Sequence, residues 1–158
     1  MNPIPYARQV ITEDDIKAVT AVLQSDFLTQ GPAVPAFEAA LCKASGAAHA
    51  VAVNSATSAL HIAYMALDIG PGDIVWTVPN TFVATANAAL YCGASVDFVD
   101  IDPATYNMSV EALAAKLEKA KAEGRLPKLI APVHFAGQSC DMEAISALAH
   151  PLGIRIVE

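Results

Sequence analysis

Small and hydroxyl-bearing residues gather at 54–59, where a predicted strand passes into a predicted helix. The amides at a helix N-terminus bind anions, and the hydroxyls of Thr57 and Ser58 can add hydrogen bonds to phosphate oxygens. The small side chain of Ala56 lets a ligand approach the backbone closely. The segment therefore suggests a phosphate site without glycines, although Ser and Thr also cap helices that bind nothing.

Two more segments whose side chains could bind a ligand follow predicted strands. Phe82 could stack on a planar ring in the crevice beyond the carboxyl ends of parallel strands. His134 and Gln138 could hydrogen-bond the substituents of a cofactor ring. Each has a plain structural alternative. Phe82 could belong to the core, and His134 could be a satisfied structural residue, because no second histidine stands at metal-ligand spacing.

The elements that must position these residues alternate along the chain. Two helices come first, one beginning after Thr12 and ending near residue 24 or 25, the other within 34–46 and ending at Gly46. Apolar runs then predict strands at 48–54, 73–79, 95–101, 126–135 and 154–158. Helices are predicted between them at 55–70, 79–94, 110–124 and 141–153. This alternation predicts an α/β fold with a mainly parallel sheet covered by helices on both faces.

Composition narrows the function further. A hydrophobic content of 54% indicates a globular protein, and 9 basic against 16 acidic residues give a net charge of -7, which disfavours nucleic acid as a partner. We expect no membrane segment and no secretion signal, and three cysteines without paired spacing fit a cytoplasmic protein. The fingerprints of dinucleotide-binding proteins, P-loop proteins and serine hydrolases are missing from the sequence.

Taken in order, several segments resemble the DegT/DnrJ/EryC1/StrS sugar aminotransferases: IPYARQVITEDDIKAV, SDFLTQGPAVPAFE, NSATSALHIA, TVPNTFVATANAALYCGA, VDFVDIDPATYNMSVEAL and PVHFAGQSCDM. The resemblance implies the fold of aspartate aminotransferase, which is fold type I of the pyridoxal-phosphate enzymes. It also implies a helical arm and substrate loop at 1–30, and a partial cofactor-binding domain at 31–158. Within the family, the sequence is most similar to the transaminases that make UDP-4-amino-4,6-dideoxy-N-acetyl-β-L-altrosamine for pseudaminic acid. This similarity lies in the residues around Tyr6 and in the segments SDFLTQGP and NSATSAL.

The resemblance also assigns roles. Pyridoxal phosphate is the implied cofactor, with its phosphate held by Thr57, Ser58 and the backbone at Ala56, and with Phe82 against its ring. Gln138 and His134 would lie near that ring. The implied substrate-binding residues are Tyr6, Asp26, Phe27, Leu28, Thr29 and Ala56. The implied reaction transfers an amino group, with glutamate as donor, to C4 of a 4-keto-6-deoxy UDP-N-acetyl sugar.

The lysine that forms the Schiff base in this family has no counterpart in the sequence. None of the six lysines stands in a matching context, so we expect that residue to lie beyond Glu158 and the chain to be an inactive N-terminal fragment. A sugar 3-dehydratase of the same family, in which a histidine replaces the lysine, stays open, as does a non-catalytic protein. The resemblance further implies a homodimer when the protein is full length.

Overall fold

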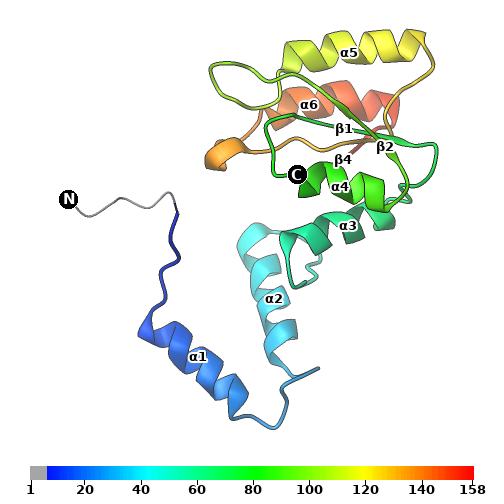
Figure 1. Cartoon of the computed structure of the whole chain (residues 1–158). Helices are drawn as coiled ribbons and strands as arrows, with labels where there is room; N and C mark the ends of the chain where they lie inside the picture. The colour runs from blue at the N-terminus through cyan, green and yellow to red at the C-terminus, as the bar shows by residue number, and fades with distance from the viewer. Residues whose placement is uncertain (1–6) are drawn as a thin grey trace. The chain divides into compact units, whose positions relative to one another are not determined.

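The computed structural model describes residues 7–158, which divide into two compact units between Ala52 and Val53. Figure 1 shows the helices and strands along the chain. The N-terminal unit holds α1 (Glu13–Leu23) and α2 (Ala33–Ser45). Thr12 caps α1 in a reciprocal capping box with Asp15, and Gly46 ends α2 in the left-handed conformation with φ 76°. Both predicted helices are confirmed.

The C-terminal unit alternates helices and strands. Its elements are α3 (Ala56–Ala66), β1 (Ile74–Thr77), α4 (Ala84–Tyr91), β2 (Ser95–Phe98), α5 (Val110–Ala122), β3 (Leu129–Ile130), the 3-10 turn η1 (Phe135–Gly137), α6 (Met142–Ala149), the 3-10 turn η2 (His150–Leu152) and β4 (Arg155–Ile156). All three strand pairings are parallel, and the order across the sheet is β2-β1-β3-β4. The predicted α/β class with a parallel sheet is confirmed.

Two apolar clusters cover the two faces of this sheet. One joins Trp76, Val99 and Ile130 to side chains of α5 and α6, including Leu113 and Ile145. The other joins Val75 and Leu129 to α3 and α4 through Tyr64, Ala88 and Ala89. Successive residues of a strand point to opposite faces, so Val75 and Trp76 enter different clusters. Figure 1 shows α5 and α6 on one side of the strands, with α3 and α4 on the other.

One predicted strand is wrong. Residues 48–54 form no strand, and the side chain of Val51 is 75% exposed. A strand exists only where its backbone groups pair with a neighbour, and within residues 7–158 no strand lies beside this segment. Other predicted elements are shorter in the structure; the strand predicted at 95–101, for example, ends at Phe98, and the one predicted at 154–158 pairs only at Arg155 and Ile156. The helix predicted to reach Gly70 ends at Ala66, and the strand predicted at 126–135 pairs only at Leu129 and Ile130.

Candidate functional site

The sheet has a topological switch point between β1 and β3. From β1 the chain passes to β2 on one side, and it then returns to place β3 on the other side of β1. Ligands of open parallel sheets bind in the crevice beyond the carboxyl ends of the strands at such a point. The two loops that leave this edge are residues 78–83 after β1 and 131–141 after β3. They carry Phe82, His134 and Gln138.

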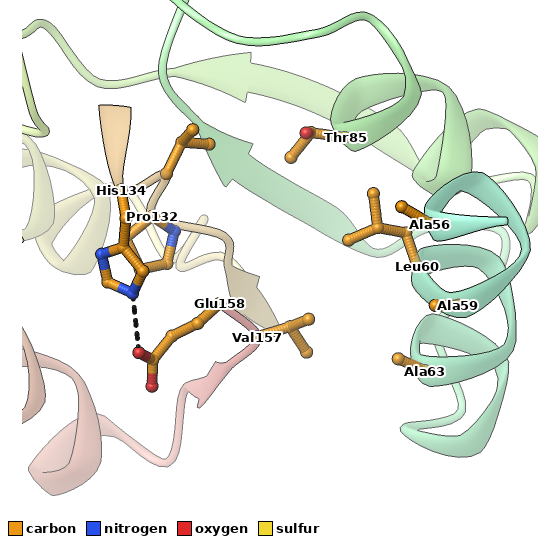
Figure 2. A pocket seen from close by; sticks show the side chains of 10 residues that line it. Ala56, Ala59, Leu60, Ala63, Thr85, Pro132, His134, Val157 and Glu158 are labelled. Atoms are coloured by element: carbon orange, nitrogen blue, oxygen red, sulfur yellow. Dashed lines mark hydrogen bonds and ion pairs between the residues drawn. The ribbon is translucent and has the colours of Figure 1, made fainter. Parts of the chain in front are cut away.

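A pocket of about 360 Å³ opens beside this edge of the sheet. Figure 2 shows its lining, with one wall of small and apolar side chains from α3 and the other wall from the ends of β3 and β4. The lining residues are Ala56, Ala59, Leu60, Ala63, Thr85, Pro132, Val133, His134, Val157 and Glu158. The pocket thus brings together Ala56 and His134, which are 78 positions apart in the sequence (134 minus 56).

The N-terminus of α3 borders the pocket through Ala56. Ser55 caps the helix by accepting a hydrogen bond of 3.2 Å from the amide of Ser58. The Ser58 hydroxyl donates to Oδ1 of Asn54 at 2.7 Å, so its single proton is already used. In the described part of the chain, no group hydrogen-bonds the Thr57 hydroxyl or the amides of Ala56 and Thr57. These three donors are therefore available for an anion.

His134 is held in one tautomer by both of its ring nitrogens. Nδ1 accepts a hydrogen bond of 3.0 Å from the amide of Cys140, so the proton of the neutral ring must be on Nε2. Nε2 lies 2.9 Å from a carboxylate oxygen of Glu158, to which it donates (Figure 2). The pair puts one polar contact into an otherwise mostly apolar pocket.

Phe82 does not belong to the core, so the structural alternative for this residue is wrong. Its side chain is 76% exposed, and it is not among the residues that line the pocket. Phe82 precedes α4 in a loop that is tied to that helix by a hydrogen bond of 2.9 Å between the hydroxyls of Thr81 and Thr85. Its ring is therefore free to contact a ligand.

Gln138 is exposed, and its side chain reaches only the neighbouring Ser139 carbonyl, at 3.5 Å. Its backbone carbonyl instead accepts a hydrogen bond of 3.0 Å from Asn107. Asn107, from the loop between β2 and α5, is one of the few buried polar side chains of the C-terminal unit, and the sequence analysis missed it. The signal was weak, because an asparagine after a turn is common and its distant partners are invisible in the sequence.

The loop around η1 is strained. Ala136 has φ 52° and ψ 27°, in the left-handed region that costs a non-glycine residue about 1–2 kcal/mol. Buried Cys140 closes the loop, and its thiol donates to the carbonyl of Val133 at 3.2 Å. Burial raises the pKa of this thiol, so Cys140 is a structural group rather than a nucleophile.

Of the predicted substrate-binding residues, Ala56 lines the pocket. Tyr6 falls outside the described residues. Asp26, Phe27, Leu28 and Thr29 form the turn between α1 and α2 in the N-terminal unit, where Phe27 is 60% and Leu28 is 65% exposed. Their role in substrate binding stays a prediction.

Within residues 7–158, His, Cys, Asp and Glu side chains form no cluster that could hold a metal ion. Across the same residues, no helix is both long enough and apolar enough to cross a membrane.

Comparison with known proteins identifies the family to which this chain belongs. Residues 9–158 match the model of the DegT/DnrJ/EryC1/StrS aminotransferase family. The chain is 45% identical over 155 residues to the spore coat polysaccharide biosynthesis protein SpsC of Bacillus subtilis (strain 168), covering 98% of this chain and 38% of that protein. The chain therefore spans about two fifths of the length of this relative.

Solved structures agree with the sequence match. PseC of Helicobacter pylori, an aminotransferase of pseudaminic acid biosynthesis, superposes with a TM-score of 0.86 at 36% identity, over 96% of this chain and 40% of PseC. A protein of Streptococcus pneumoniae assigned as a sugar aminotransferase, solved in its PLP-form, superposes with a TM-score of 0.82 at 30% identity, over 94% of this chain and 36% of that one. The fold is thus that of the pyridoxal-phosphate-dependent aminotransferases of fold type I, and the chain belongs to the DegT/DnrJ/EryC1/StrS aminotransferase family.

Proposed function

We propose that this chain forms the cofactor-binding part of a pyridoxal-phosphate-dependent aminotransferase of nucleotide sugars. The observation that carries the proposal is the pocket between α3 and the ends of β3 and β4, which borders an α3 N-terminus with unpaired donors. A phosphate at one end of a flat, mostly apolar ring is the kind of ligand that such a pocket suits.

The residues present fit this cofactor. The amides of Ala56 and Thr57, together with the Thr57 hydroxyl, would hold the phosphate, and Ser58 could join them only by giving up its bond to Asn54. Phe82 would lie against the ring, because its exposed side chain follows β1 at the switch point. His134 and Gln138 would contact the ring from the loop after β3.

When bound, pyridoxal phosphate supplies an electron sink and carries the amino group between the two substrates. The chain's own residues bind, orient and exclude water. The α3 donors fix one end of the cofactor, and the apolar side chains of Leu60 and Val157 keep water from one side of the pocket. His134 keeps a proton on Nε2, where it donates to Glu158, while its Nδ1 accepts from the amide of Cys140.

For the reaction we propose transfer of an amino group, with glutamate as donor, to C4 of a 4-keto-6-deoxy UDP-N-acetyl sugar of the pseudaminic acid type. The similarity to PseC supports this substrate, and the similarity to SpsC supports a sugar more generally. Tyr6 and the turn at Asp26–Thr29 would face the nucleotide sugar, with Ala56 close to it.

We further propose that the whole protein works as a cytoplasmic homodimer. Apolar side chains of α1 and α2 support a partner surface, because Val19 is 61%, Leu23 is 64% and Phe37 is 55% exposed in the N-terminal unit. None of the six lysines lines the pocket in the described residues, so we expect the 158-residue chain to bind the cofactor without a covalent bond and to transfer no amino group by itself.

Two measurements test the proposal. Titration of the chain with pyridoxal phosphate, followed by cofactor fluorescence and by the ³¹P signal of its phosphate, should show one saturable site that pyridoxal fills less tightly. The whole protein should then release 2-oxoglutarate from glutamate over many turnovers when the UDP-4-keto sugar is present, and no more than one equivalent per bound cofactor when the sugar is omitted. A chain that binds pyridoxal and its phosphate equally would contradict the phosphate site, and a whole protein without 2-oxoglutarate release would contradict the reaction.

A further inference from the structure

Asn107 makes three hydrogen bonds to one distant loop. Its side-chain amide donates to the carbonyl oxygens of Gln138 and Ser139, both at 3.0 Å, and its side-chain oxygen accepts from the amide of Phe135 at 2.9 Å. The residue is only 4% exposed. Both donors of the carboxamide and one of its acceptor sites are therefore used on residues 135–139.

The backbone of Asn107 is itself fixed. Its carbonyl accepts a hydrogen bond of 2.9 Å from the amide of Asp102, and its amide donates to the Thr105 hydroxyl at 3.3 Å. Next to it, Met108 forms an antiparallel bridge with Ile101. Asn107 thus stands on a small closed turn that follows β2, and it holds the other loop from a rigid base.

The points at which Asn107 holds the loop lie on either side of its two left-handed residues. Ala136 at φ 52° and Gly137 at φ 83° are consecutive left-handed residues, and they lie between Phe135 and Gln138. An alanine keeps the left-handed backbone conformation only where its surroundings enforce that conformation. The three bonds to Asn107 provide that enforcement.

The same loop sets the state of His134. It runs from His134 to Cys140, and the hydrogen bond from the Cys140 amide to Nδ1 of His134 closes it. That bond leaves the proton on Nε2, directed at Glu158 in the pocket. If the loop relaxed, the amide of Cys140 would leave Nδ1, and the contact between Nε2 and Glu158 would be the one hydrogen bond left to favour this tautomer.

We propose that Asn107 is a positioning residue of the pocket: it clamps residues 135–139 and thereby holds His134 as the Nε2-protonated tautomer that faces Glu158. Asn107 itself does not line the pocket. Its importance for cofactor binding rests on the proposed function, whereas its control of His134 does not.

The test compares Asn107→Asp and Asn107→Ala with a matched control. Asn107→Asp keeps the shape and the acceptor for Phe135 but turns an oxygen toward the two carbonyls that the amide group contacted. Asn80→Asp makes the same chemical change in the turn after β1, where the amide of Asn80 donates to the Tyr106 carbonyl at 3.3 Å rather than to the 134–140 loop. The ¹⁵N spectrum of the imidazoles reports the tautomer, and His134→Gln identifies the signal among four histidines.

We expect His134 to show a single Nε2-protonated form in the unaltered chain and in Asn80→Asp, and a tautomer mixture in both Asn107 variants. Amide exchange at Phe135 and Cys140 should accelerate about tenfold or more in those variants, because a buried hydrogen bond is lost. If Asn107 contributed only stability, its variants would unfold at a lower temperature, but the tautomer of His134 in the folded chain would be unchanged. Asn107 variants with the original tautomer and slow exchange at both amides would overturn the proposal.

If the Asn107 variants do not fold, amide exchange in the unaltered chain tests the proposal. In the described structure, the amide of Ser139 has no acceptor, whereas the amides of Phe135 and Cys140 each have one. Protection of these two amides relative to Ser139 supports the clamp, and exchange of Phe135 as fast as Ser139 overturns it. Because neither measurement uses pyridoxal phosphate, a chain that fails to bind the cofactor would refute the proposed function alone.

Discussion

The hydroxyl group of Tyr64 donates a hydrogen bond of 3.1 Å to the carbonyl oxygen of Thr85, and the Tyr64 side chain is completely buried. This contact joins α3 to the first turn of α4. Thr85 also lines the pocket and shares a hydrogen bond with Thr81 in the loop after β1. One phenol therefore fixes the two helices that border the pocket.

Replacing Tyr64 with phenylalanine should lower the free energy of unfolding by about 0.5–1.5 kcal/mol, because a buried hydrogen bond to the Thr85 carbonyl is lost. Urea unfolding followed by circular dichroism measures the change. Tyr91→Phe is the matched control, since the Tyr91 side chain is 57% exposed and its loss of a hydroxyl should cost less than about 0.5 kcal/mol. Equal losses in the two variants would show that the contact contributes nothing.

The same phenol predicts how stability depends on alkaline pH. Burial, aided by the nearby Cys92, raises the pKa of Tyr64 from 10.0 to about 12. Between these values the unfolded chain loses the Tyr64 proton while the folded chain keeps it, so the stabilisation present below pH 10 is lost as pH rises toward 12. Unfolding curves from pH 8 upward should fall less steeply for Tyr64→Phe. Parallel curves for the two proteins would contradict the raised pKa.

At the N-terminus of α3, Thr57→Val should weaken binding of pyridoxal phosphate by roughly tenfold or more, because a hydrogen bond to a charged group is lost. Binding of pyridoxal, which has no phosphate, should stay unchanged. Cofactor fluorescence measures both affinities. Thr20→Val on α1 makes the same change on an exposed helix and should leave both as they are. An equal loss of affinity for pyridoxal would show that Thr57 does not bind the phosphate.

Phe82→Ala should weaken the binding of both ligands without selectivity. The ring is 76% exposed, so its removal should change the free energy of unfolding by less than about 0.5 kcal/mol. Loss of stacking should weaken pyridoxal and its phosphate alike, by several-fold to about tenfold. Phe98→Ala, which removes a 46% exposed ring from β2, is the control. If Phe82→Ala bound both ligands with unchanged affinity, Phe82 would not contact the cofactor ring.

Much of the fold could be predicted because local signals and tertiary packing agree. Thr12 and Gly46 mark a helix start and a helix stop, and both act as the sequence indicates. The segment 48–54 shows the limit of this reasoning, since its apolar alternation is typical of a strand but a strand also needs a partner. Sequence patterns show which backbone prefers to be extended. They do not show what lies beside it.

The site divides in the same way. Ala56 and His134 could be named from the sequence because each stands where a strand ends or a helix begins, and the pocket brings both together. Glu158 and Asn107 could not, because their importance comes from contacts across 24 and 28 or more positions. The hydrogen-bond partner that fixes the tautomer of His134 is a backbone amide, which no side-chain pattern reveals.

A last prediction concerns the ion pair that ties the turn before β1 to the start of β3. Asp73 accepts hydrogen bonds of 2.9 Å from both Lys128 and the amide of Gly70, and these interactions lower the pKa of Asp73. The two side chains are 27% and 39% exposed, so solvent screening limits the contribution to about 1 kcal/mol or less. Asp73→Asn keeps the acceptor for Gly70 and removes the charge.

Because the folded-state pKa of Asp73 lies below the ordinary value of 3.8, its stabilisation is present above that pH and is lost as pH falls through the folded-state pKa. Asp73→Asn should therefore be less stable than the unaltered chain at neutral pH, and the two should converge in acid. A double-mutant cycle with Lys128→Met isolates the pair, and its coupling should shrink in added salt because the pair is partly exposed. A difference that persisted undiminished in acid would mean that the carboxylate charge of Asp73 does not stabilise the fold.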